Sequence, residues 1–184
     1  RDRLSTRGVV PACRSLDCVT LFTHNTADAA LIASVTATFD SNDPFARPNS
    51  PNNALDTFGQ WQGPLKLAVI EPNQLAFFGD TTYADAYRKT VDRLEQTDVQ
   101  LKPIDFNPFV TAANQLYDGP WITERYIAIS ELLERTPDVI LPVTRNIIGA
   151  GKERSATEVY KSIYLLAELR NQCLSRLSGC DALL

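Results

Sequence analysis

The chain has 184 residues, 44% of them hydrophobic, and a formal net charge of -4, which fits a single globular domain with its own core. A pI near 5.0 leaves no basic surface of the kind that nucleic acids require, so we expect no nucleic-acid partner. No window approaches the roughly 20 apolar residues of a membrane helix, and we expect no membrane association and a cytoplasmic location.

The first part of the chain predicts one helix followed by a long connection. We expect the helix at residues 26–39, because Thr26 can cap its start and Asp28 lies in the first turn, where the helix dipole favours an anion. Residues 40–64 predict an irregular connection, since prolines interrupt any regular pairing. These prolines are Pro44, Pro48, Pro51 and Pro64.

The sequence pattern of residues 65–104 predicts a strand, a helix and a second strand. Residues 65–70 form a short apolar run, and residues 99–104 alternate as a strand would. Between them, Thr82–Asp85 resembles a capping box, and Asp85–Lys89 is an i,i+4 ion pair on the expected helix. A strand-helix-strand unit favours parallel pairing, and hence an α/β fold class.

Residues 107–178 predict a helical region with three interruptions, at Gly119-Pro120, at Pro137 and around residues 149–151. Ser155–Glu158 is a full capping box that begins a long amphipathic helix. Residues 180–184 predict the start of a further strand.

Side chains that often carry catalysis or bind metals are sparse. His24 is the only histidine, which excludes a multi-histidine metal site, and no G-x-S-x-G nucleophile elbow occurs. Residues 149–152 lack the spacing of a phosphate-binding loop, so we interpret them as a turn between helices. We interpret the cysteines as free, mostly buried thiols, with a disulfide or an adventitious metal site left open. They are Cys13, Cys18, Cys173 and Cys180.

Two segments resemble a known family. Residues 5–18 read Ser-Thr-Arg-Gly-Val-Val-Pro-Ala-Cys-Arg-Ser-Leu-Asp-Cys, and residues 116–126 read Leu-Tyr-Asp-Gly-Pro-Trp-Ile-Thr-Glu-Arg-Tyr. Both are similar to segments of allophanate hydrolases, the branch of the amidase-signature family that works in urea breakdown. The resemblance runs over nearly the whole chain. It implies that residues 1–184 form a single amidase-signature domain, incomplete at both ends, with a mixed sheet covered by helices.

The resemblance also implies an activity, the hydrolysis of allophanate to ammonia and carbon dioxide without a cofactor. The family uses a serine nucleophile, a second serine and a lysine, and the nucleophile lies in a Gly/Ser-rich stretch. No Gly-Ser dipeptide occurs here, so we expect no catalytic residue in this chain, which would be an internal piece that is inactive alone. A link to a biotin-dependent urea carboxylase and a homodimer are further expectations. The alternatives are a glutamine-dependent amidotransferase A-type subunit and a non-catalytic amidase-like binding domain.

Tyr117 and Arg125 are the candidate substrate-binding residues. A guanidinium presents a fork of donors that matches a carboxylate, and a phenol adds one hydrogen bond. In allophanate hydrolases, the tyrosine and arginine of the similar motif contact the carboxylate end of the substrate. The residues alone leave open that Tyr117 packs in the core and that Arg125 pairs with Glu124 or Asp118. Because Gly119-Pro120 interrupts the helix, the candidate pair must converge through a turn.

Other polar residues of the N-terminal part are interpreted as structural. We expect Asp40 and Asp43 to cap local backbone amides in the irregular connection. By resemblance, Arg14, Ser15 and Asp17 stabilise the region beside the nucleophile loop rather than act directly in catalysis.

Overall fold

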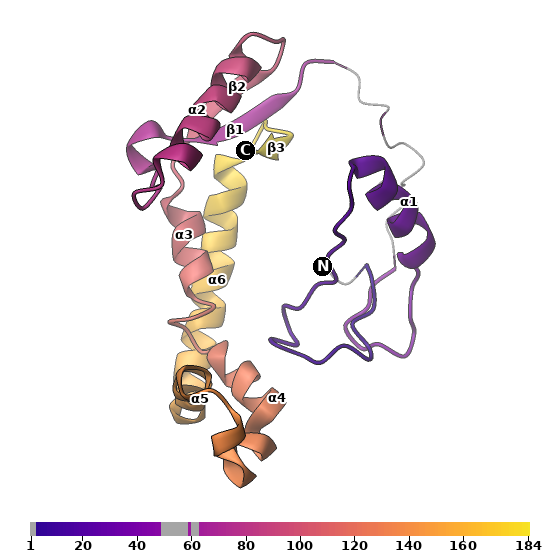
Figure 1. Cartoon of the computed structure of the whole chain (residues 1–184), viewed down its shortest axis with the longest axis vertical. Coiled ribbons are helices and arrows are strands. Elements are labelled where there is room, and N and C mark those ends of the chain that lie inside the picture. Colours follow the sequence, from indigo (N-terminus) through magenta and orange to yellow (C-terminus); the bar gives the residue numbers. More distant parts are fainter. Residues whose placement is uncertain (1–2, 49–58, 60–62) are drawn as a thin grey trace. The chain divides into compact units, whose positions relative to one another are not determined.

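The structure, a computed structural model, describes residues 3–48, 59 and 63–184. It divides into two compact units, and each is assembled from two separate stretches of chain. Unit 1 comprises Arg1–Trp61 and Pro120–Arg154, and unit 2 comprises Gln62–Gly119 and Ser155–Leu184. Figure 1 shows the helices and strands in sequence colours. Within the described ranges, no helix is long and apolar enough to cross a bilayer.

Unit 2 is built on a small parallel sheet with the strand order β2-β1-β3. The central strand, β1 (Lys66–Ile70), pairs with β2 (Gln100–Ile104) along its whole length and with β3 (Ala182–Leu183) on its other side. Ala68 of β1 is fully buried and both of its strand neighbours are buried too, as expected of a strand covered on both faces. The predicted α/β class and the parallel pairing are confirmed.

The helices of unit 2 follow the predicted order. α2 (Thr81–Glu95) connects β1 to β2, and α3 (Asn107–Asn114) packs along α6 (Ala156–Arg176). The predicted capping box at the start of α6 is confirmed, since the Ser155 hydroxyl accepts the Glu158 amide and the Glu158 carboxylate accepts the Ser155 amide. This reciprocal cap fixes the first residue of the longest helix in the described chain.

Two details of α2 correct the sequence-based prediction. The cap is Asp80 rather than Thr82, because the Asp80 carboxylate accepts a first-turn amide at 2.8 Å and the helix begins one residue before Thr82. Asp85 pairs with Arg88 at 2.9 Å, an i,i+3 contact, instead of with Lys89. Both basic residues lie on the same side of the helix as Asp85, and the guanidinium offers more donors in a fixed plane.

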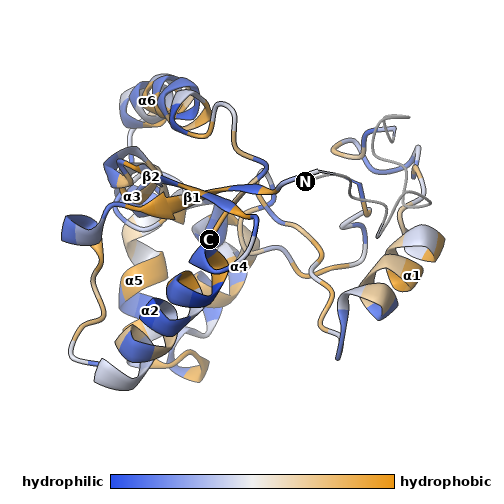
Figure 2. Cartoon of the chain, turned by 90° about the horizontal axis from the view of Figure 1, so that it is seen from above, coloured by the Kyte–Doolittle hydropathy of each residue, from blue (hydrophilic) through white to orange (hydrophobic). Residues whose placement is uncertain are grey.

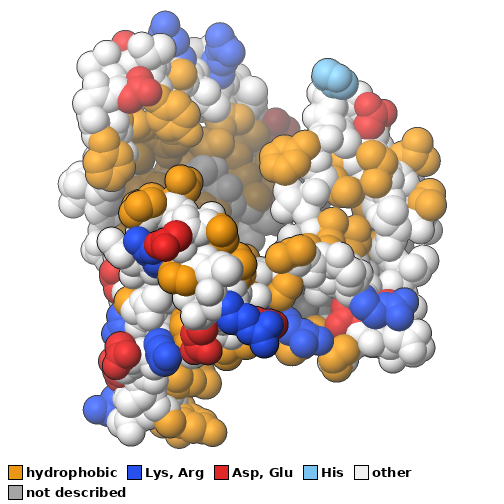
Figure 3. All heavy atoms as spheres, turned by 60° about the horizontal axis from the view of Figure 1, so that its bottom comes forward, with side chains coloured by type: hydrophobic (Ala, Val, Ile, Leu, Met, Phe, Trp, Pro, Cys, Tyr) orange, Lys and Arg blue, Asp and Glu red, His pale blue; other side chains and the backbone are white. Residues whose placement is uncertain are grey.

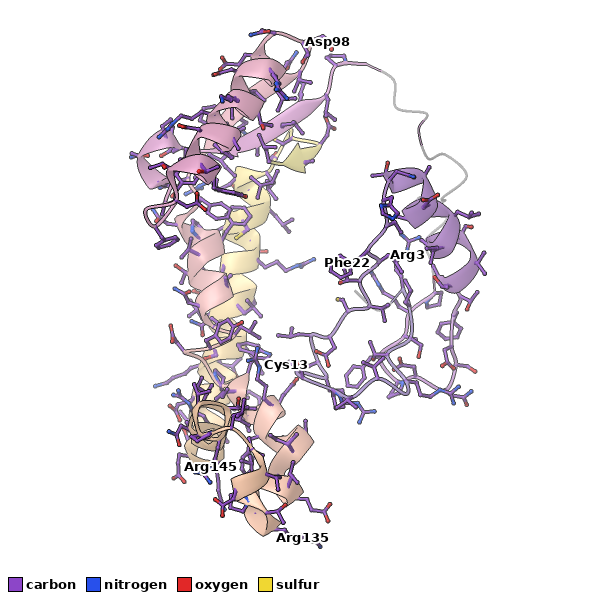
Figure 4. The ribbon with its side chains drawn as sticks, viewed as in Figure 1. Arg3, Cys13, Phe22, Asp98, Arg135 and Arg145 are labelled. Atoms are coloured by element: carbon purple, nitrogen blue, oxygen red, sulfur yellow. The ribbon has the colours of Figure 1, made fainter. Side chains whose placement is uncertain are left out.

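Unit 1 contains one isolated helix and a helical cluster. The elements are α1 (Thr26–Thr36), α4 (Ile122–Arg135), η4 (Pro137–Val139), α5 (Pro142–Gly149) and η5 (Ala150–Glu153). α4 packs against α5 and η5, and Figure 4 labels Arg135 near the end of α4 and Arg145 on α5. The interruptions predicted at Gly119-Pro120, at Pro137 and around residues 149–151 are confirmed.

α1 is shorter than predicted, ending at Thr36 instead of residue 39. Its cap is Asn25 rather than Thr26, since the Asn25 side chain accepts the Asp28 amide at 2.9 Å while Thr26 is already helical. None of its residues is buried, and it carries much less polar colour than α2 (Figure 2). Residues 40–48 contain no helix or strand, as predicted. Residues 49–58 and 60–62 of the same connection lie outside the described part of the chain.

Candidate functional site

Arg125 is the fourth residue of α4, within unit 1. Its side chain is half-buried, and its Nε atom is shielded from solvent. Ile122, at 2% exposure, anchors the start of the helix in the core of the unit. The backbone leaves helical geometry at Ile129 (φ -128°, ψ 16°), which places Arg125 in a short segment before a kink. A guanidinium on such a segment can direct its fork toward a planar anion.

A loop at residues 12–17 contacts the start of α4. The Ser15 amide donates to a Glu124 carboxylate oxygen at 2.9 Å, and the Cys13 thiol lies 3.6 Å from the Trp121 carbonyl oxygen. Figure 4 labels Cys13 beside the start of this helix. Asp17 closes the loop by accepting two of its backbone amides, each at 3.0 Å. Glu124, one of the two acids considered as a partner for Arg125, thus binds the N-terminal loop.

The short helix η5 packs against the same part of α4. The Thr123 hydroxyl donates to the Gly151 carbonyl oxygen at 3.0 Å. A Cβ atom on Gly151 would lie 2.6 Å from an α4 carbonyl oxygen and 2.9 Å from the Tyr126 Cβ, so only glycine allows this approach. The Tyr126 hydroxyl donates to Glu134 at 2.7 Å, and Lys152 pairs with the same carboxylate oxygen at 3.3 Å. Residues 149–152, where the sequence predicts a turn between helices, thus form the end of α5 and the first residues of η5, and they pack against α4.

A second polar cluster lies in the N-terminal part of unit 1. Asp43 is 7% exposed and accepts hydrogen bonds from the Ser5 hydroxyl (2.8 Å), the Thr6 amide (3.0 Å) and the Phe45 amide (2.9 Å). These bonds, the Phe45 amide foremost, hold the pKa of Asp43 below its ordinary value. Asp40 accepts a local backbone amide at 2.9 Å, so the interpretation of both acids as backbone caps is confirmed.

A cavity of about 290 Å³ adjoins this cluster and is lined by Arg7, Arg14, Asp17 and Asp43, among others. Its charges are engaged within the unit, because Arg7 pairs with Asp40 at 3.1 Å and the Arg14 guanidinium lies 5.3 Å from the centre of the Phe45 ring. Figure 3 shows basic and acidic side chains interspersed on the face it draws. These contacts lie within unit 1, and the role of Arg14, Ser15 and Asp17 beside the nucleophile loop stays a prediction.

Tyr117 lies in unit 2, in the turn that follows α3. Tyr117 is 62% exposed, so it does not pack in the core of unit 2. The turn requires glycine at position 119, since a Cβ atom there would collide with the Gln115 carbonyl oxygen. Tyr117 and Arg125 belong to different units, and the convergence of the pair stays a prediction.

The histidine and the cysteines form no site together. His24 is exposed, as the pale blue residue in Figure 3 shows. All four cysteines are free, but only Cys13 is buried and Cys18 is exposed, so the prediction of mostly buried thiols is wrong. Burial raises the pKa of the half-buried Cys173 thiol. In the part of the chain that the structure describes, no three His, Cys, Asp or Glu residues are grouped to hold a metal ion.

Comparison with known proteins decides the family. A model of the Amidase family matches residues 1–184. The chain belongs to the Amidase family. This amidase-family chain is 31% identical to the urea amidolyase of Saccharomyces cerevisiae over 182 residues, which are 97% of the chain and 10% of that protein.

Two solved structures share the fold of this amidase-family chain. Kluyveromyces lactis allophanate hydrolase matches with a TM-score of 0.87 and 31% identity, over 99% of this chain and 29% of that one. The crystal structure of an amidase matches with a TM-score of 0.73 and 18% identity, over 98% of this chain and 37% of that one. The chain thus spans a minor part of the length of each protein that it matches.

Proposed function

We propose that this chain is part of a carbon–nitrogen hydrolase that converts allophanate to ammonia and carbon dioxide in urea degradation. The supporting observation is the 31% identity to K. lactis allophanate hydrolase across 99% of the chain, against 18% identity to the other amidase structure. Similarity to a urea amidolyase supports a functional link to a biotin-dependent urea carboxylase. In this proposal, the two units belong to one amidase domain, which can form a homodimer.

The proposed contribution of these residues is the wall that binds the substrate carboxylate. Arg125 offers two parallel N–H donors to the carboxylate, and the exposed Tyr117 hydroxyl adds a third hydrogen bond. Allophanate carries this carboxylate next to the amide that is cleaved. The acyl transfer itself would use the serine nucleophile and backbone oxyanion hole of the family, supplied by other parts of the enzyme.

The test is Arg125→Lys in the complete enzyme, with kcat/KM measured on allophanate and on a neutral amide of similar size. Lysine keeps the charge but loses the planar fork. Losing a two-pronged, charge-assisted contact costs on the order of 3 kcal/mol, or about a hundredfold in kcat/KM. We expect this loss for allophanate and little change for the neutral amide. Tyr117→Phe removes one hydrogen bond and should cost about 1 kcal/mol on allophanate.

Arg135→Lys is the matched control, because Arg135 lies near the end of the same helix and is exposed, paired with Glu131. It should leave both activities unchanged, and circular dichroism should show that every variant is folded. If Arg125→Lys lowers kcat/KM equally for both substrates, or for neither, then Arg125 does not bind the substrate carboxylate. Turnover of glutamine in place of allophanate would favour the amidotransferase alternative.

A further inference from the structure

We infer that Glu124 and Gly151 are positioning residues that set the direction of the Arg125 guanidinium, and so determine the preference for a substrate with a carboxylate. This inference rests on the proposed function of Arg125. Neither residue needs to contact the substrate. Each takes part in a contact between the first turns of α4 and another element of unit 1: Glu124 of α4 binds the loop at residues 12–17, and Gly151 of η5 packs against α4.

The helical segment that carries Arg125 cannot fix its own direction. It runs from Ile122 to the kink at Ile129, and an isolated helix below about 12 residues is marginal in water. The kink also separates it from the second half of α4, which ends at Arg135. Its orientation must therefore come from tertiary contacts.

The first of these contacts is made by the loop at residues 12–17. The Ser15 amide donates to the Glu124 carboxylate at 2.9 Å, a charge-assisted hydrogen bond between residues 109 apart in sequence. The loop is itself fixed, because Asp17 accepts two of its amides and Cys13 is 3% exposed. Glu124 precedes Arg125 directly, so this bond restrains the backbone from which the guanidinium projects.

The second contact comes from η5. Gly151 approaches α4 so closely that a Cβ would lie 2.6 Å from the Ile122 carbonyl oxygen and 2.9 Å from the Tyr126 Cβ. The Thr123 hydroxyl donates to the Gly151 carbonyl oxygen at 3.0 Å. Tyr126 follows Arg125 in sequence, so the residues on both sides of Arg125 are held by different elements. A substrate-binding group must stay within about 0.5 Å of its working position.

The experiment measures a selectivity ratio in the complete enzyme: kcat/KM on allophanate divided by kcat/KM on a neutral amide of similar size. Glu124→Ala removes the acceptor for the Ser15 amide. Because a displacement of about 1 Å can reduce rates roughly a hundredfold, we expect the ratio to fall about tenfold to a hundredfold. Glu124→Gln keeps an acceptor oxygen and should retain most of the wild-type ratio.

Gly151→Ala tests the other contact independently. The added methyl group must displace the first turns of α4 or η5, and we expect the selectivity ratio to fall about tenfold or more. Glu131→Ala is the matched control, since Glu131 is an exposed glutamate of α4 beyond the kink, and its ratio should equal that of the wild type. Thermal unfolding of each variant separates loss of selectivity from loss of folded protein.

The outcomes separate this inference from the proposed function. An unchanged ratio in Arg125→Lys contradicts the proposed function. A reduced ratio in Arg125→Lys together with an unchanged ratio in Glu124→Ala contradicts only the positioning role. If Glu124→Ala does not fold, Glu124→Asp decides, because its carboxylate is one methylene short of the Ser15 amide. A wild-type ratio in Glu124→Asp then overturns the inference, and a reduced ratio supports it.

Discussion

The two units differ in the residues that they bury, while both contain long-range hydrogen bonds from a backbone amide to a carboxylate. Unit 2 buries a set of apolar side chains on its strands and helices, namely Leu67, Ala68, Val69, Ala84, Ile104 and Leu169. In unit 1 the buried residues include Cys13, Ile122 and the carboxylate Asp43, and long-range hydrogen bonds join side chains to backbone amides. Apolar burial is non-directional, whereas each hydrogen bond fixes a distance and an angle. The start of α4, which carries Arg125, thus depends on a contact with defined geometry.

The largest effect is expected from a charge in the core of unit 2. Ala68→Asp places a carboxylate at a fully buried position of the central strand, and an unpaired buried charge costs several kcal/mol. We expect the amides of β1 and β2 to lose their protection from hydrogen exchange. The measurement is amide exchange by mass spectrometry, with denaturant unfolding alongside.

Ala86→Asp is the control for this substitution, because Ala86 is exposed on α2 in the same unit. It should cost only the difference in helix propensity, about 0.5–0.7 kcal/mol. If Ala68→Asp unfolds at the same denaturant concentration as Ala86→Asp, the apolar core assigned to unit 2 is wrong.

A smaller, pH-dependent effect is expected in unit 1. The folded structure lowers the pKa of Asp43 from 3.8, so its stabilising contribution is complete above that pH and is lost as the pH falls through the folded-state pKa. Asp43→Asn should therefore be less stable than the wild type near neutral pH, and the difference should narrow below pH 3.8. Thermal unfolding measured from roughly pH 6 to pH 2.5 covers this window.

Asp98→Asn controls for the loss of one charge, since Asp98 is an exposed aspartate of unit 2, labelled in Figure 4. A gap between the wild type and Asp43→Asn that stays constant down to the lowest pH would show that the carboxylate charge does not stabilise the N-terminal segment.

The smallest effect is expected at Phe78, which has a φ of 51° and is 98% exposed. A bulky residue in this left-handed region is strained, and asparagine tolerates it better. Phe78→Asn should raise stability by about 1 kcal/mol, or a few degrees in Tm. Phe77→Asn should lower stability, because the Phe77 ring lies 5.8 Å from that of Tyr87. Equal shifts in Tm for both variants would contradict this difference between adjacent residues.

The separation in sequence between contacting residues explains which features could be predicted from the sequence. β1 and the start of α6 were predictable, because an apolar run and a capping box are local patterns. The caps of α1 and α2 were assigned to the wrong residue, because more than one polar side chain at each helix start could accept the first-turn amide. The bond between Ser15 and Glu124 spans 109 residues and leaves no periodic signal.

The prediction of the candidate site residues rested on resemblance to a family rather than on a local sequence pattern. Arg125 and Tyr117 were singled out by a motif, and no local pattern distinguishes them from other polar residues. Gly151 had a weak signal, since a glycine in a turn between helices is common. Its close approach to α4 became visible only in three dimensions.

The interleaving of the two units imposes an order on folding during synthesis. The pairing of β1 with β2 needs no residue beyond Ile104, so that sheet contact can form early. The hydrogen bond between Ser15 and Glu124 cannot form until Glu124 has been synthesised. At a synthesis rate of about 5–20 residues per second, the separation of 109 residues corresponds to a delay of roughly 5–20 seconds. Throughout that interval the N-terminal loop, including the Cys13 thiol, is without its α4 contacts and accessible to chaperones and oxidants.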